Sequence, residues 1–196
     1  FKSQKPSIYS SMSKLYLEEK KYEKAIEILD SGRVLFDSDQ GLINEEINLY
    51  IKLERTDDLI NKLSINIKND SSNFLYYVIR GTCYQNMKNI DSAISDYKSA
   101  LKINPAELTA LNNISSCYLK QTEPIVKSIN SLSYNQTSKH KKLKQDLKKI
   151  HAKVLPFLER YTQLKPEDNA ILNVLAEIYY KLEMYDKSKE TKAKIN

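Results

Sequence analysis

The sequence has little of what turn-rich folds and most catalytic sites require. Only three of its 196 residues are glycine and five are proline, and tryptophan is absent. Sandwiches and barrels need many tight turns, so this shortage argues against them and favours helices. With two histidines, two cysteines and no glycine-rich loop, most metal, nucleophilic and phosphate-binding sites lack their residues. No apolar run approaches the roughly 20 residues of a membrane-spanning helix.

The formal net charge of +6 comes from one segment. Residues 137–153, TSKHKKLKQDLKKIHAK, hold seven lysines and one aspartate, and the remainder of the chain is neutral. The chain is 41% hydrophobic and 29% charged, a composition typical of globular proteins. The basic character is therefore local and is not a field over the whole surface.

A period of 34 residues runs through the chain. Identical or similarly apolar residues recur at this interval in three columns: Tyr16, Tyr50, Tyr84 and Tyr118; Leu15, Leu49, Cys83 and Cys117; and Ala25, Leu59 and Ala93. Within a unit the apolar residues follow helical spacing, as in Ile8, Met12, Leu15 and Tyr16 or in Ala25, Ile26, Leu29 and Val34. Each unit thus predicts two amphipathic helices. One pair cannot bury both faces alone, so we expect the pairs to stack into an α-solenoid.

The unit at residues 74–105, FLYYVIRGTCYQNMKNIDSAISDYKSALKINP, resembles a tetratricopeptide repeat. Its large and small residues follow the family pattern at Tyr77, Gly81, Tyr84, Ala93, Tyr97, Ala100 and Pro105. The first unit departs from that pattern at Gly32 and Asp37, and the second at Leu59. The resemblance implies an all-α fold with one solenoid domain over 1–196. Its repeats would lie near 6–38, 39–72, 73–106, 107–167 and 168–196.

The fourth repeat contains an insertion near 121–150. Tyr118 and Tyr179 are 61 residues apart, which is 27 more than the period. An apolar stripe at Leu143, Leu147, Ile150 and Val154 predicts a helix from about residue 138 to 164, about 40 Å long. We expect the preceding helix to continue past Pro124 with a kink, and the two to form an elongated hairpin that turns near 133–138.

A lengthened penultimate repeat is similar to one in a group of exported bacterial tetratricopeptide proteins. That resemblance implies a bacterial, exported protein in the periplasm or associated with the envelope, with the cytoplasm as the alternative. The chain opens at Phe1 without methionine, which predicts a processed or trimmed product. A removed signal peptide and additional preceding repeats both remain open.

The chemically reactive residues favour structural roles. Cys83 and Cys117 share a column with leucines, which predicts reduced, buried thiols. Equivalent positions on stacked pairs lie roughly 10 Å apart, too far for a disulfide. His140 and His151 are about 16 Å apart along one helix and cannot share a metal ion.

The acidic residues do not predict a catalytic pair. Adjacent carboxylates on a helix diverge by about 100° and do not converge on a substrate. Asp57, Asp91 and Asp168 precede or open predicted helices, where carboxylates satisfy free amides. We therefore predict a protein that is not an enzyme and that uses no cofactor or metal.

The resemblance implies that the first helix of each pair lines a concave groove for a peptide or protein partner. By the family pattern, eight residues would face this groove: Ser10, Lys14, Asn44, Asn48, Val78, Thr82, Asn112 and Ser116. Asparagine can donate to and accept from an extended peptide backbone. The family version that clamps a terminal carboxylate is disfavoured, because five of these positions (Ser10, Lys14, Asn48, Val78, Thr82) fit it poorly. Ordinary polar surface is the alternative reading of the groove residues.

The lysine-rich hairpin at 137–153 supports an alternative function, which is binding to an anionic surface such as nucleic acid or membrane headgroups. Its candidate contacts are Lys141, Lys142, Lys148 and Lys149. The segment has no arginine and no aromatic residue, which argues against base-specific recognition and makes nucleic acid the less favoured ligand. A solvated face opposite the Leu143–Val154 stripe is the favoured interpretation of these lysines, and anionic contact is the alternative. The sequence leaves the ligand and the oligomeric state open.

Overall fold

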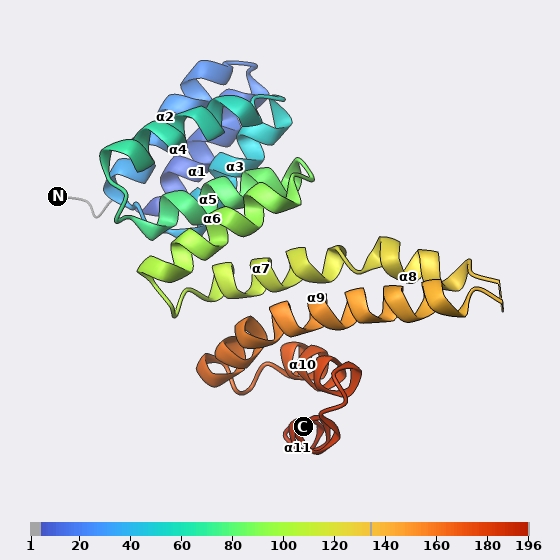
Figure 1. The fold of residues 1–196 in the computed structure, drawn as a ribbon. Helices are drawn as coiled ribbons and strands as arrows, with labels where there is room; N and C mark the ends of the chain where they lie inside the picture. Colours follow the sequence, from blue (N-terminus) through green and yellow to red (C-terminus); the bar gives the residue numbers. More distant parts are fainter. Residues whose placement is uncertain (1–4, 134, 196) are drawn as a thin grey trace. The chain divides into compact units, whose positions relative to one another are not determined.

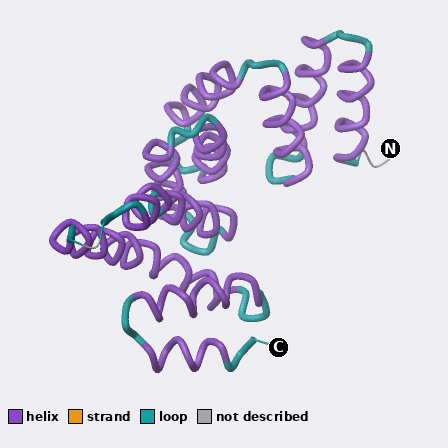
Figure 2. The backbone as a smooth tube through the Cα atoms, turned by 90° about the vertical axis from the view of Figure 1, so that its right-hand side faces the viewer, coloured by secondary structure: helices purple, strands orange, loops and turns teal. Residues whose placement is uncertain are grey.

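The computed structural model describes residues 5–133 and 135–195, and every regular element in these ranges is a helix (Figures 1 and 2). The elements are α1 (Pro6–Glu18), α2 (Tyr22–Leu35), α3 (Gln40–Lys52), α4 (Thr56–Asn69), α5 (Phe74–Asn86), α6 (Ile90–Ile103), α7 (Leu108–Lys120), α8 (Glu123–Asn130), α9 (Thr137–Leu164), α10 (Asn169–Lys181) and α11 (Tyr185–Lys192). The predicted all-α solenoid of helical pairs is confirmed.

Five pairs account for ten of these helices, and α8 is the inserted element. The first helices of the pairs are α1, α3, α5, α7 and α10, and the second helices are α2, α4, α6, α9 and α11. The chain divides into two compact units, Phe1–Cys83 and Tyr84–Asn196, which we describe separately. The prediction of one domain over 1–196 stays a prediction.

The turn inside a pair has the same backbone conformation in four of the five pairs. Lys20, Glu54, Lys88 and Glu183 occupy equivalent repeat positions, and their φ angles are 59°, 56°, 62° and 64°. A side chain is strained in this left-handed region, which favours glycine. In the fourth pair the equivalent residue is Thr122, whose φ is −77°. The chain therefore continues there into α8 instead of turning back, which places the insertion at this turn.

Replacing Lys88 with glycine should stabilise the protein. Glycine relieves the left-handed strain, and we expect a gain of about 0.5–1 kcal/mol after its greater freedom in the unfolded chain is counted. Urea unfolding followed by circular dichroism measures this gain. Lys102→Gly, in the last turn of helix α6, is the matched control and should lower the stability instead of raising it. A loss of stability in Lys88→Gly would contradict the assignment of strain to this turn.

The core of the first unit lies between its helices. Ala25, Leu29, Leu42, Leu59 and Ile79 are almost fully buried, as the repeat columns predict. Gly32 lies against Tyr9, since a Cβ atom at residue 32 would be 2.8 Å from the Tyr9 Cβ atom. The departure from the family pattern at Gly32 thus has a cause, which is the close packing of α1 on α2.

A buried cluster of charges joins the first two pairs. Glu46 on α3 is 3% exposed, and its Oε2 atom accepts a hydrogen bond from Arg33 Nε at 3.2 Å. Its Oε1 atom accepts from Lys62 Nζ at 2.9 Å, and Lys62 also contacts Asp30 at 2.5 Å. Arg33, in addition, donates to the backbone oxygen of Asp37. Each member is therefore paired, which a charge removed from water requires.

The second unit has an apolar core that also contains hydrogen bonds between polar side chains around Tyr97. Tyr97 is fully buried; its hydroxyl donates to Gln85 at 2.8 Å and accepts from Asn113 at 3.2 Å. Val154 and Leu158, in the C-terminal half of α9, are almost fully buried. These residues anchor α9 next to α7 and α10, as Figure 1 shows for the long orange helix.

The hairpin is confirmed, with one correction to the segment that precedes α9. Helix α9 begins one residue before the expected start and ends at Leu164, with Pro156 inside it. The expected continuation of the preceding helix past Pro124 is wrong: α7 ends at Lys120, and Pro124 lies in the first turn of a separate helix, α8. Proline fits there because the first turn needs no amide donor. Tyr134, in the predicted turn, lies outside the described residues.

Four residues of the predicted apolar pattern are not buried. Leu15 and Val34 are 60% and 83% exposed, and Ile8 and Met12 are also exposed. The equivalents of Leu15 are buried in every other pair, so the pattern marked a packing position that none of the described helices covers in the first pair. Within the hairpin, Leu143, Leu147 and Ile150 are only half-buried.

Candidate binding face

The first helices of the first unit enclose a shallow hollow. This α1–α3 hollow has a volume of about 330 Å³. It is lined by Ser13, Lys14, Leu17, Glu18, Glu45, Asn48, Leu49 and Lys52. Leu17 and Leu49 give it an apolar floor, and a 2.7 Å ion pair joins Lys14 to Glu45 across its rim. Such a hollow fits one apolar side chain flanked by polar backbone or charged groups.

The second unit has two hollows of the same kind. The α7–α10 hollow, about 340 Å³, is lined by Asn112, Ser115, Ser116, Leu119, Lys120, Glu123, Leu158, Ile171 and Val174. The α10–α11 hollow, about 390 Å³, is lined by Asn173, Val174, Glu177, Tyr180 and Lys192. Val174 lines both, so the two hollows adjoin along one face of α10.

The three hollows repeat the same positions of the 34-residue unit. Leu17, Leu119 and Tyr180 are equivalent, and so are Lys14, Ser116 and Glu177 once the insertion is removed. We call the surface of the first helices that carries these positions the first-helix face. Apolar residues at one position and polar residues at the other therefore give each hollow an apolar part and a polar part.

Four of the eight predicted groove residues line these hollows. Lys14 and Asn48 lie in the α1–α3 hollow, and Asn112 and Ser116 in the α7–α10 hollow. Ser10 is half-buried and Asn44 exposed, and neither lines one of these three hollows.

The remaining two predicted residues are turned toward their own helix or the core. Thr82 donates to the Val78 backbone oxygen at 2.9 Å. Val78 is only 6% exposed, so the expectation that its side chain faces outward is corrected. Its apolar side chain gains more from burial than from contact with solvent.

Several lining residues were missed by the sequence analysis. Leu17 and Leu119 were not among the predicted groove residues, and Asn173, Glu177 and Tyr180 belong to the fifth repeat, from which no groove residue was predicted. Tyr180 is 60% exposed and packs edge-on against Tyr185, with ring centroids 5.4 Å apart. The signal that could have found them is the repeat alignment itself, extended through the 27-residue insertion.

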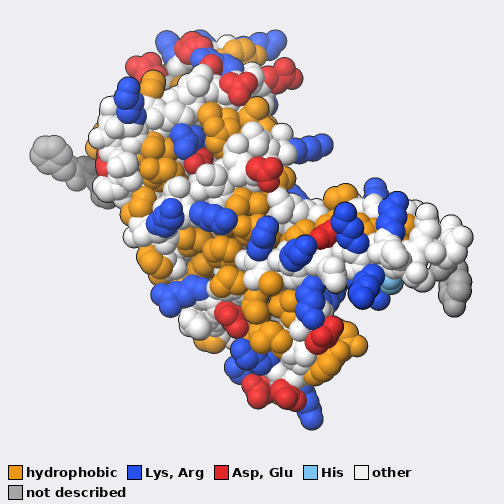
Figure 3. Space-filling view, viewed as in Figure 1, with side chains coloured by type: hydrophobic (Ala, Val, Ile, Leu, Met, Phe, Trp, Pro, Cys, Tyr) orange, Lys and Arg blue, Asp and Glu red, His pale blue; other side chains and the backbone are white. Residues whose placement is uncertain are grey.

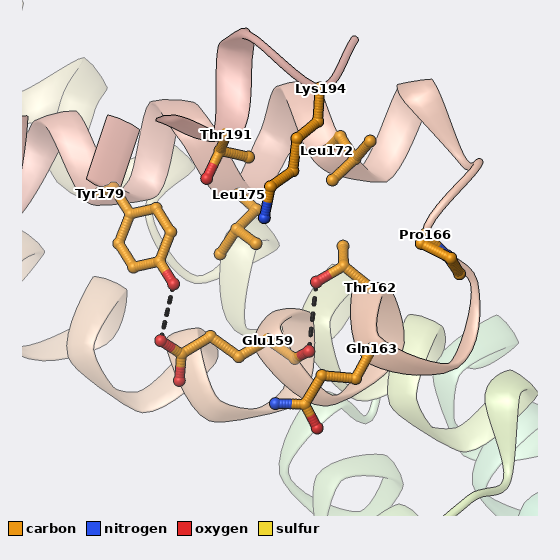
Figure 4. A pocket seen from close by; sticks show the side chains of 9 residues that line it. All are labelled: Glu159, Thr162, Gln163, Pro166, Leu172, Leu175, Tyr179, Thr191 and Lys194. Carbon is orange, nitrogen blue, oxygen red and sulfur yellow. Dashed lines mark hydrogen bonds between the residues drawn. The ribbon is translucent and has the colours of Figure 1, made fainter. Parts of the chain in front are cut away.

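A further hollow lies where α9, α10 and α11 meet (Figure 4). It measures about 410 Å³, with Leu172 and Leu175 at its apolar side. Tyr179 donates to Glu159 at 2.7 Å, and burial followed by this hydrogen bond raises the Tyr179 pKa. The same place between the first two pairs is filled by the Glu46 cluster. The hollow is therefore a looser version of a packing junction.

The thiols and histidines carry no assembled reactive site. Both cysteines are free and buried, and burial raises the pKa of Cys83 to about 12 and of Cys117 to about 11. Such thiols stay protonated and unreactive at neutral pH. Over the described residues, no three His, Cys, Asp or Glu side chains are grouped as metal ligands. The prediction of reduced core thiols is confirmed.

His151 gives the second unit a pH dependence. It is buried on α9, and burial, followed by the nearby Lys181, lowers its pKa; Glu177 opposes this. The unfolded chain therefore binds the proton at a higher pH than the folded one, so stability should fall as pH drops below about 6.5. His151→Gln should make the free energy of unfolding less dependent on pH between about pH 7 and 5. His140→Gln, near the hairpin tip, should leave the pH dependence as it is in the wild type. Equal slopes in all three proteins would contradict this.

The hairpin presents lysines to solvent along α9 (Figure 3). Among the seven lysines of 137–153, described ion pairs involve only Lys148, with Glu183 at 3.0 Å, and Lys149, with Asp146 at 3.1 Å. Lys141 and Lys142 are exposed. Two of the four lysines predicted as basic contacts are thus already engaged by carboxylates, although exposed pairs of this kind are weak.

Comparison with known proteins identifies the repeat. Residues 75–106 match the family model described as tetratricopeptide repeat. The third helical pair, α5 and α6, is a tetratricopeptide repeat. In addition, 128 residues align at 32% identity with the Drosophila melanogaster protein named "BBSome complex member BBS4 homolog", covering 63% of this chain. This chain spans about a quarter of that relative, since 26% of it is covered.

Two solved structures show the same fold. A crystal structure of MamA superposes with a TM-score of 0.57 at 14% identity, covering 97% of this chain and 89% of MamA. YrrB, titled "a TPR protein with an unusual peptide-binding site", gives 0.52 at 14% identity, covering 95% and 82%. These likenesses concern the fold alone. They do not establish that the protein is bacterial or exported. None of the described helices combines the length and apolarity needed to cross a membrane.

Proposed function

We propose that this tetratricopeptide repeat protein is a noncatalytic interaction scaffold that binds a peptide or protein segment on its first-helix face. The observation that carries the proposal is the recurrence of one hollow at the same repeat positions in both units. A single hollow is common on any protein surface. Three that share their lining positions indicate a surface built by the repeat.

The chemistry of the hollows favours an extended segment with apolar side chains. Each hollow holds an aliphatic or aromatic residue, Leu17, Leu119 or Tyr180, beside groups that can hydrogen-bond to a peptide backbone. Asn112 and Asn173 supply both donors and acceptors in the second unit. YrrB, whose title names a peptide-binding site, has the same fold and adds support.

Selection from a random-peptide display library tests the proposal. Peptides selected on the wild-type chain should bind Asn112→Lys and Tyr180→Ala at least about tenfold more weakly, because central contacts of an interface often contribute more than about 1 kcal/mol each. Val126→Lys, at an exposed site on α8, is the matched control and should bind normally. Selected peptides that bind all three variants equally would overturn the proposal.

A second candidate function is electrostatic binding of an anionic surface by the hairpin. It is favoured by the lysines of 137–153 that have no described ion pair, Lys141 and Lys142 among them. Binding would fall steeply with salt. Titration with a single-stranded oligothymidine and with phosphatidylserine vesicles, at two salt concentrations, distinguishes the anions. Replacing Lys141, Lys142, Lys148 and Lys149 together with glutamine should abolish binding, and an unchanged affinity would remove this candidate.

A further inference from the structure

One side of α9 faces the last helical pair and continues beyond it. Lys148 Nζ is 3.0 Å from Glu183 Oε2, in the turn between α10 and α11. About three turns further along α9, Glu159 accepts a hydrogen bond from Tyr179 of α10 at 2.7 Å. Helix α10 ends just before the turn that holds Glu183, whereas α9 extends on toward the tip of the hairpin (Figure 1). The part of this side that lies nearer the tip than Lys148 is therefore beyond the end of α10.

Three lysines follow this side of α9. Lys144 and Lys141 lie four and seven positions before Lys148, which places all three on one side of the helix over about 10 Å. We call these three residues the lysine row. Lys141 and Lys144 are exposed, and neither has a described ion pair. Like charges three and four positions apart repel and lower the stability of a helix, so an anion bound to the row would stabilise the hairpin.

The other lysines of this segment lie on a different side of α9. Lys142, Lys149 and Lys153 are about a third of a turn away from the lysine row around the helix. There Asp146 accepts a hydrogen bond from Lys149 at 3.1 Å. Asp146 is the one acidic residue in the sequence of 137–153, so α9 supplies a carboxylate to that side and none to the lysine row.

Glu183 shows how a carboxylate docks on the lysine row. It belongs to the turn of the fifth pair, where its φ angle is 64°. The side chains of Glu183 and Lys148 are 65% and 49% exposed, so their ion pair lies at the surface. One lysine of the row thus already binds a carboxylate of this chain, and the next two along the helix are exposed to solvent.

We propose that the lysine row binds an acidic, extended segment of a partner protein. Side chains two positions apart in an extended segment point to one side and are about 7 Å apart. Carboxylates at that spacing reach Lys141 and Lys144, whose long side chains start about 5 Å apart along the helix axis. An amphipathic helix fits less well, because the row has no apolar side chain for it to cover. The inference rests on the second candidate function above and names its ligand.

The position of the lysine row favours a peptide over other anions. The row lies in the inner angle between the hairpin and the last pair, since Lys148 contacts the turn between α10 and α11 (Figure 1). A flat bilayer does not enter such an angle, whereas a single chain does. Proteins that bind single-stranded nucleic acid stack bases on aromatic or arginine side chains, and residues 137–153 hold no Phe, Tyr, Trp or Arg.

Fluorescence anisotropy of a labelled octapeptide of alternating serine and glutamate, titrated with the full chain at low salt, tests the proposal. Lys141→Gln/Lys144→Gln should weaken binding about tenfold, which is a factor of about three for each exposed pair. Lys142→Gln/Lys149→Gln removes the same charge from the other side of α9 and should weaken binding less than about threefold. Circular dichroism verifies that the variants remain folded.

Glu183→Gln gives a result of the opposite sign. It removes the carboxylate that competes for Lys148, so it should tighten binding of the acidic peptide about twofold or more. An octapeptide of alternating serine and glutamine is the uncharged control and should not bind. Unchanged or weaker binding by Glu183→Gln would contradict the use of Lys148 by the ligand.

Parallel titrations with oligothymidine and with phosphatidylserine vesicles separate this proposal from the second candidate function. Binding of the acidic peptide that both double variants weaken equally would overturn the lysine row, because general attraction to the positive charge would then explain it. If oligothymidine or the vesicles bind and the acidic peptide does not, the proposal is overturned and the second candidate function stands. If none of the three anions binds, both are overturned.

Discussion

Glu46→Ala should lower the free energy of unfolding of the first unit by about 3–5 kcal/mol, the range found when one partner of a buried ion pair is removed. The Glu46 side chain is 4% exposed, and it holds Arg33, whose side chain is 12% exposed, and Lys62. Its loss leaves the Arg33 guanidinium largely out of water without its carboxylate. Arg33 retains only backbone oxygens, among them Asp37. Urea unfolding followed by circular dichroism measures the effect.

Two variants show whether the cost comes from the unpaired charge. Glu45→Ala breaks the exposed pair with Lys14 and should cost at most about 1 kcal/mol. Arg33→Leu/Glu46→Ile should recover most of the loss, because Leu101 and Ile114 occupy the same two repeat positions at the junction of the third and fourth pairs. If Glu46→Ala costs no more than Glu45→Ala, the cluster does not hold the first two pairs together.

Removing residues 122–148 should leave a folded protein that has lost the lysine-rich hairpin. The deletion takes out 27 residues and brings the fourth pair back to the 34-residue period. Lys149 then stands at the turn position that Lys20 and Lys88 occupy elsewhere. Helix α8 buries none of its residues, so little of the core is lost with it. We expect the helical circular dichroism per residue to be retained and polyanion binding by the hairpin to disappear.

The control for this deletion is a substitution in the part of α9 that the deletion leaves in place. Leu158→Ala in the full chain should cost about 2–5 kcal/mol, because Leu158 is 1% exposed beside α7 and α10. Leu143→Ala, in the hairpin, should cost clearly less because Leu143 is half-buried. A deletion variant that is unfolded would show that the hairpin is part of the folding unit and would contradict this description.

The repeat period predicted the fold because the packing positions are set by local periodicity. Tyr50, Tyr118 and Tyr179 are buried where the columns place them, and α9 spans the residues that its apolar stripe indicated. The period does not say whether a packing position has a neighbour. Leu15 follows the same pattern as Leu49 but is exposed, since burial depends on what lies beside the helix.

The binding face was predicted less completely than the fold. Lys14, Asn48, Asn112 and Ser116 line hollows, as predicted. Val78 is buried instead, because an apolar side chain at this otherwise polar position gains from contact with the core. Tyr180 and Glu177 were missed because the groove residues were predicted from the first four repeats only. The Glu46 cluster was also missed. Its four charges come from three helices, and no sequence spacing relates them.

The measurement that tests the binding face most directly is photo-crosslinking of a display-selected peptide, with the crosslinked residues located by mass spectrometry. Binding on the first-helix face predicts crosslinks on α7 and α10, at residues such as Asn112, Ser116, Asn173 and Tyr180, with further crosslinks near Asn48 when the first unit takes part. Helices α2, α4 and α6 and the hairpin residues 137–153 should remain unlabelled. Crosslinks confined to 137–153 would contradict the account and would transfer the binding function to the lysine-rich hairpin.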